Sequence, residues 1–84
     1  MTLVTMDMYL IEQMGYQIVS TENMILCSKI GFETEFFELK LIENRYYVSV
    51  PLKNSVYQYK TSFLQYDEAI CYMNHKFKDY CDLL

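Results

Sequence analysis

Apolar and polar residues alternate from Phe36 to Val50, and the alternation is interrupted once, at Glu43-Asn44. Alternation is typical of a half-buried strand, because successive side chains of a strand point to opposite faces of the sheet. Asn tolerates the positive φ of a tight turn, so we predict a β-hairpin that turns at Glu43-Asn44. In this register one face of the hairpin is apolar and carries Phe37, Leu39, Leu41, Tyr46, Val48 and Val50.

The opposite face of the predicted hairpin is mostly compatible with solvent. A slip of one residue would turn the apolar set out to water, so the pattern specifies the register well. The pairs predicted on the polar face are Glu38 with Ser49, Lys40 with Tyr47, and Ile42 with Arg45.

Two further strands are predicted between Tyr16 and Ile30, around a turn at residues 21–23. The run Met24–Cys27 is continuously apolar, which favours either a strand covered on both faces or a strand that pairs at an interface.

A last strand is predicted over Val56–Lys60, after a turn through Lys53-Asn54. This register places Tyr57 opposite Val50 and Tyr59 opposite Val48. Both tyrosines would then join the apolar face of the central hairpin, which favours an antiparallel meander.

Helical patterns flank the strands. A short helix is predicted over Met6–Met14, with Thr5 as its N-cap and Gly15 as the residue that ends it. The motif Ser62-Phe-Leu-Gln65 matches a capping box and predicts the start of a second helix of roughly 18 residues. Its apolar stripe consists of Tyr66, Ile70, Met73, Phe77, Tyr80 and Leu84.

Both predicted helices need an apolar surface to cover. We therefore predict a single α+β domain spanning residues 1–84. Its antiparallel meander would have four or five strands, and the short N-terminal and the longer C-terminal helix would pack on one face of it.

Composition narrows the classes of function. The chain has 84 residues, 52% of them hydrophobic, and a net charge of −4, which argues against direct binding to a nucleic-acid backbone. Apolar runs extend over only a few residues, so no membrane span is expected. The three cysteines are odd in number and lack a C-x-x-C spacing, and no signal peptide pattern precedes them. These features predict a cytoplasmic protein with reduced thiols.

Residues that could carry chemistry are few. Cys71, His75 and Asp79 recur at every fourth position of the predicted C-terminal helix. The span from the first to the third is about 12 Å, so at most two of them could hold one ion. The sequence contains no Gly-rich phosphate loop and no nucleophile placed beside a base. We therefore predict a protein that is not an enzyme and that uses no cofactor.

The predicted solvent face of the sheet has the composition of a protein-binding surface, because Tyr47 lies there among Ile42, Lys40 and Arg45. A set of carboxylates in the same part of the sequence could contact basic residues of a partner. The alternative is an ordinary solvated surface of scattered amphipathic side chains. The residues predicted to bind a partner are Glu33, Glu35, Glu38, Lys40, Ile42, Glu43, Arg45 and Tyr47.

In general character the chain resembles the small acidic proteins that bacteriophages and mobile elements use to bind host machinery, among them the anti-CRISPR proteins. The resemblance rests on length, the acidic run Glu33–Glu43, the tyrosine-rich α+β layout and the lack of catalytic motifs. It implies an inhibitor that occupies a surface of a host protein, such as one that binds nucleic acid. It also implies a location in the host cytoplasm if the chain is encoded by a phage.

Two alternatives remain open at this point. One is a self-assembling homodimer, in which the Met24–Cys27 run or an open strand edge pairs with a second copy. The other is a metal-binding protein that uses Cys71 and His75.

Overall fold

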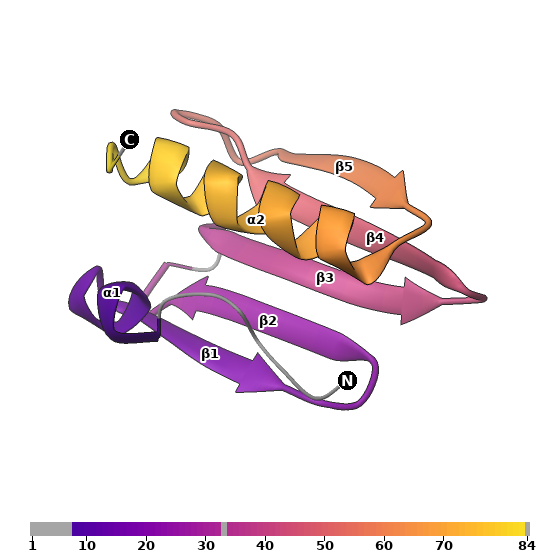
Figure 1. Ribbon diagram of the computed structural model, residues 1–84. Coiled ribbons are helices and arrows are strands. Elements are labelled where there is room, and N and C mark those ends of the chain that lie inside the picture. Colours follow the sequence, from indigo (N-terminus) through magenta and orange to yellow (C-terminus); the bar gives the residue numbers. More distant parts are fainter. Residues whose placement is uncertain (1–7, 33, 84) are drawn as a thin grey trace.

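The computed structural model describes residues 8–32 and 34–83. The described chain forms a five-stranded antiparallel sheet in the order β1-β2-β3-β4-β5, with two helices on one face (Figure 1). This arrangement confirms the predicted α+β meander. The elements are α1 (Met8–Gln13), β1 (Tyr16–Ser20), β2 (Met24–Lys29), β3 (Phe36–Ile42), β4 (Arg45–Pro51), β5 (Gln58–Phe63) and α2 (Tyr66–Tyr80).

The central hairpin has the predicted register. Glu43 and Asn44 both adopt positive φ, 49° and 65°, as the two central residues of a type I′ turn do. The position of this turn determines which residues of β3 and β4 pair. In this register the apolar side chains of both strands face the helices. The confirmed pairs are Glu38 with Ser49, Leu39 with Val48, Lys40 with Tyr47, Leu41 with Tyr46, and Ile42 with Arg45.

The predicted register of the last strand is wrong by two residues. Tyr59 lies opposite Val50, and Tyr57 precedes the strand and is 74% exposed. The connection after β4 is longer than the predicted two-residue turn, and inside it the backbone N–H of Tyr57 donates to Oγ of Ser55. A shift of two residues preserves the alternation of faces, so Tyr59 keeps its predicted side. The longer connection nevertheless leaves Tyr59 52% exposed, outside the core.

The predicted capping box is also wrong. Ser62 belongs to β5, where it pairs with Tyr47, and Gln65 is the N-cap of α2 without a side-chain capping bond. The pairing of β5 with β4 extends through Phe63, so the strand includes the residue that the motif assigned to the helix. The helix itself is confirmed from Tyr66 to Tyr80, and Leu84 lies outside the described residues.

At the N-terminal end, the structure describes α1 from Met8, whereas Thr5 and Met6 lie outside the described residues. Gly15 has the expected role: its φ is +84°, and its N–H donates to the carbonyl of Glu12. A residue with a side chain would be strained in that conformation.

Strand β2 lies inside the sheet, hydrogen-bonded to β1 on one side and to β3 on the other. The prediction that Met24–Cys27 pairs with a second copy is therefore wrong for this strand, because neither of its backbone edges is free. Its continuous apolar character has a different cause. Ile25 and Cys27 are fully buried beneath the helices, and Met24 and Leu26 are half-buried on the other face.

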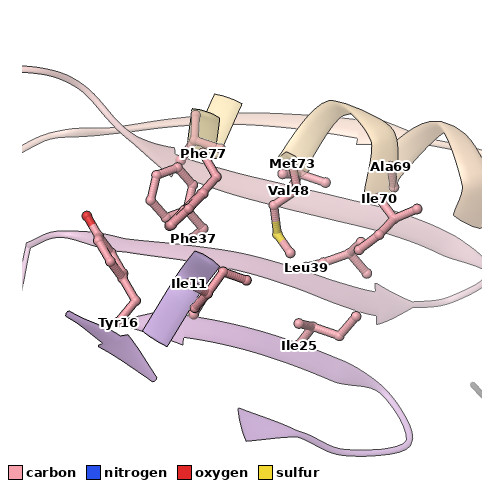
Figure 2. Packing of buried hydrophobic residues seen from close by; sticks show 12 residues of the cluster. Ile11, Tyr16, Ile25, Phe37, Leu39, Val48, Ala69, Ile70, Met73 and Phe77 are labelled. Carbon is pink, nitrogen blue, oxygen red and sulfur yellow. The ribbon is translucent and has the colours of Figure 1, made fainter. Parts of the chain in front are cut away.

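The core contains a cluster of aromatic rings at the end of the sheet where β3 begins (Figure 2). The rings of Phe37 and Phe77 lie 5.2 Å apart, and Tyr16 contacts both at 5.9 and 5.1 Å. Tyr80 packs edge-on against Phe37 at 5.7 Å. This cluster fastens α2 to β1 and β3, and edge-to-face geometry adds to the stabilisation from burial.

Within the described residues, neither helix is long and apolar enough to cross a membrane.

Candidate protein-binding surface

The face of the sheet opposite the helices, here called the open face, is covered by no helix of the described chain (Figure 1). Strand alternation and the observed registers determine which side chains it carries. Its members are Gln17, Val19, Met24, Leu26, Ser28, Phe36, Glu38, Lys40, Ile42, Arg45, Tyr47, Ser49, Pro51, Gln58, Lys60 and Ser62.

Apolar side chains on the open face remain in contact with water. Ile42 and Tyr47 are 49% and 43% exposed, and Val19 at the far side of the sheet is 48% exposed. Ile42 and Tyr47 are diagonal neighbours across β3 and β4, because Tyr47 pairs with Lys40 and Ile42 pairs with Arg45. Exposed aromatic and aliphatic groups side by side are typical of the centre of a protein–protein interface.

The open face is hollowed on both sides of Glu38. One hollow of about 230 Å³ is lined by Ile42, Tyr47 and Lys60, among others. The other, of about 610 Å³, lies between Leu26, Phe36 and the loop that precedes β3, where Phe32 is 54% exposed. Glu38 lines both hollows, so they are neighbours along β3, and the two together are called the concave region.

Polar contacts fix one wall of this region. Ser49 is only 6% exposed although it lies on the open face. Its hydroxyl donates to Oε1 of Gln58 at 3.1 Å, and Nε2 of Gln58 donates to the carbonyl of Thr34 at 2.8 Å. These contacts hold the loop before β3 against β5, so this wall is fixed by hydrogen bonds within the chain.

The charges of the open face are mixed, with an excess of basic groups. Lys40 lies 3.6 Å from the carboxylate of Glu38, and Nε of Arg45 donates to Oγ of Ser62 at 3.0 Å. Lys60 adds a further cation beside Ser49. A partner would therefore meet an apolar centre with charges of both signs around it.

Five of the eight predicted binding residues lie together on the open face: Glu38, Lys40, Ile42, Arg45 and Tyr47. Glu43 lies at the end of the face, in the turn between β3 and β4. Glu33 lies outside the described residues.

Glu35 is placed elsewhere, by contacts within the protein. Its carboxylate accepts a hydrogen bond from the hydroxyl of Tyr80 at 2.9 Å and lies 3.8 Å from the ammonium group of Lys29. Burial and this hydrogen bond raise the pKa of Tyr80 to about 12. These contacts join the loop before β3 to the end of α2, so the role of Glu35 in the structure is to stabilise the fold.

Several residues of the concave region were missing from the predicted set, notably Leu26, Phe32 and Phe36. Leu26 lies in the continuous apolar run of β2, and this run has no alternation from which the face of Leu26 could be assigned. Phe32 lies in a loop, where no periodicity applies. Phe36 begins the central alternating stretch, an even number of positions before Glu38 and Lys40. This spacing places it on the same face of the sheet, and it could have identified the residue.

The predicted metal-ligand residues do not come together as a site. Cys71, His75 and Asp79 are all exposed on α2. In the parts of the chain that the structure describes, no three His, Cys, Asp or Glu side chains are grouped closely enough to hold a metal ion.

The cysteines are expected to differ strongly in reactivity. Burial raises the pKa of the Cys27 thiol to about 12, and the thiolate is the reactive form. Cys71 is exposed. Brief treatment of the native protein with iodoacetamide, followed by peptide mass spectrometry, should modify Cys71 and leave Cys27 unmodified until denaturant is added. Equal modification of the two cysteines in the native protein would contradict this placement of β2 in the core.

Comparison with models of protein families, with curated proteins and with solved structures gave no match to this chain. The fold and the surface define it as a small α+β meander domain in which no helix of the described residues covers one face of the sheet.

Proposed function

We propose that this chain is a non-enzymatic protein-binding module that acts by occupying a surface of a partner with its open face. The observation that carries the proposal is the concave region along β3, where Ile42 and Tyr47 remain exposed beside a hollow. Apolar groups in such a position gain free energy when a partner excludes water from them.

The proposal extends to the class of partner. Following the resemblance to small acidic phage proteins, we infer an inhibitor that blocks a basic, nucleic-acid-binding surface of a host protein. The net charge of −4 supports this inference, and the basic excess of the open face means that carboxylates beside that face would have to meet the cations of the partner. The inference is also supported by the placement of carboxylates at the end of the sheet beside Ile42, where the turns after β1 and β3 and the start of α2 lie together (Figure 1). The carboxylates of this acidic end are Glu22, Glu43, Asp67 and Glu68.

The test of the open face compares two double variants. Ile42→Ser with Tyr47→Ser removes the apolar centre. As a control, Val56→Ser with Tyr57→Ser removes an aliphatic and an aromatic group that are even more exposed, from the β4–β5 connection. Each protein is immobilised and exposed to bacterial lysate, and a protein captured by the wild type is purified and titrated. We expect the open-face variant to bind it about 30-fold more weakly or worse, equivalent to ~2 kcal/mol, because central anchors dominate interfaces. Equal binding by both variants would refute the role of the open face.

The class of partner has its own test. Glu22→Lys with Glu43→Lys reverses two charges of the acidic end, and Lys40→Glu with Lys60→Glu reverses two charges of the open face. A basic partner should associate more slowly with the first variant and faster with the second, and the differences should shrink at high salt. The opposite order would indicate an acidic partner. Glu35 is unsuitable for such a test, because its replacement would also remove the contact with Tyr80.

A further inference from the structure

Strand β1 forms one edge of the sheet and lacks the features that usually protect an edge. Its five residues, Tyr16–Ser20, include no charged residue and no proline. Proteins commonly place a Lys, a Pro or a bulge on such a strand, because its free backbone groups otherwise pair with another chain. The opposite edge, β5, has this protection in Lys60.

The hydrogen-bond pattern shows which groups of β1 are free. The N–H of Thr21 donates to the carbonyl of Met24, and the N–H of Ile30 donates to the carbonyl of Gly15. In an antiparallel ladder hydrogen-bonded pairs alternate along the strand, so residues 17 and 19 also direct their backbone groups toward β2. Tyr16, Ile18 and Ser20 therefore direct theirs outward, where no strand of the described chain lies.

We propose that the β1 edge pairs antiparallel with the β1 edge of a second copy of this chain, around a two-fold axis at Ile18. Ile18 then lies opposite Ile18 of the second copy, and Tyr16 lies opposite Ser20 at both ends. Each of these three pairs joins residues whose N–H and C=O groups point at each other, so each exchanges two hydrogen bonds. The pairing is self-complementary, as a two-fold interface requires.

The absence of charged residues from the β1 edge allows a second copy to be the occupant. Two chains with a net charge of −4 repel each other, so a stable contact between them requires a region without charge. The β1 edge meets this requirement, and exposed apolar side chains lie around it: Val19 on the open face, Met8 at the start of α1, and Ile30 directly after β2. Met8, Ile18 and Ile30 line a hollow of about 310 Å³ that can accept side chains from the second copy, with Glu12 exposed at its rim.

The dimer is independent of the proposed function, because it uses the edge of the sheet and leaves the open face free. Two five-stranded sheets would become one continuous sheet with two open faces side by side. The test of the dimer involves no partner protein, so a negative result would say nothing about binding by the open face.

The first experiment is light scattering coupled to gel filtration, at protein concentrations from about 5 to about 500 μM. The wild type should reach 20.2 kDa, twice the chain mass of 10.1 kDa. Ser20→Pro removes an outward N–H without touching the pairs with β2, and it should weaken the dimer about a hundredfold or more.

The matched control is Ser62→Pro on the opposite edge. The N–H of Leu52 donates to the carbonyl of Tyr57, and by alternation along β5 the N–H of Ser62 therefore also points outward. This variant should remain dimeric. A wild type of 10.1 kDa at the highest concentration would overturn the proposal, and so would a dimer that survives Ser20→Pro.

Amide hydrogen exchange of the wild type provides a test that needs no substitution. The amides of Ile18 and Ser20 should be protected at high concentration and lose protection on dilution, whereas those of Lys60 and Ser62 should not change. Concentration-independent protection of Ile18 and Ser20 in a protein of 10.1 kDa would mean that another part of the same chain covers the edge, and would also overturn the proposal.

Discussion

Replacing Phe77 by Ala is expected to lower the free energy of unfolding by about 3–5 kcal/mol, the usual cost of truncating a buried aromatic side chain to Ala. Phe77 is 1% exposed, and its ring contacts those of Tyr16 and Phe37 at 5.1 and 5.2 Å. The variant loses both the burial of the ring and two edge-to-face contacts, and it leaves a cavity that α2 and the sheet cannot easily close. Urea denaturation followed by circular dichroism measures the loss.

For a domain of this size the loss is a large share of the whole stability, which is roughly 4–13 kcal/mol at roughly 0.05–0.15 kcal/mol per residue. If Phe77→Ala does not fold, Phe77→Leu provides a milder version and should cost about 1–2 kcal/mol. Lys78→Ala, at the exposed neighbouring position, is the control and should change stability by less than about 0.5 kcal/mol. A loss below about 1 kcal/mol in Phe77→Ala would contradict the packing of α2 on the aromatic cluster.

Stability is expected to fall steeply as the pH rises from about 9 to about 12. Burial raises the pKa of Cys27 from 9.0 to about 12, and burial with the hydrogen bond to Glu35 raises that of Tyr80 to about 12. Burial also raises the pKa of Tyr16 well above its ordinary value of 10.0. Between the two pKa values of each group the unfolded chain has lost its proton and the folded chain has kept it. The unfolded state then binds fewer protons, so increasing pH favours unfolding.

The contribution of Cys27 alone is on the order of 4 kcal/mol across this range, because each pKa unit corresponds to about 1.4 kcal/mol. Urea denaturation at successive pH values, with reductant present, measures the slope. Cys27→Ala should flatten it between pH 9 and 12, and Cys71→Ala, which truncates an exposed thiol, should leave it unchanged. If both variants keep the slope of the wild type, ionisation of the buried thiol does not limit alkaline stability.

The surroundings of some predicted binding residues are determined by residues nearby in the sequence, and those of others by distant parts of the chain. Lys40, Ile42, Arg45 and Tyr47 were placed on one face correctly because the turn at Glu43-Asn44 and the period of two fix their directions within a single hairpin. Glu35 has a different environment, because its partner Tyr80 is 45 residues away in the sequence. No pattern of neighbouring residues in the sequence predicts which end of a helix will pack beside a loop.

By itself the sequence determined the order and type of the main elements, the register of β3 with β4, and the apolar stripe of α2. Each of these follows from a hydrophobic period or a turn residue acting over a few positions. Only the tertiary structure decided the register of β5, the interior place of β2 and the open edge of β1. The connection after β4 is long enough to allow registers that differ by two residues and keep the same faces buried, and the place of a strand in a sheet depends on partners distant in the chain. The concave region along β3 was likewise beyond the sequence, because it requires a loop to be held against β5 by Ser49, Gln58 and Thr34.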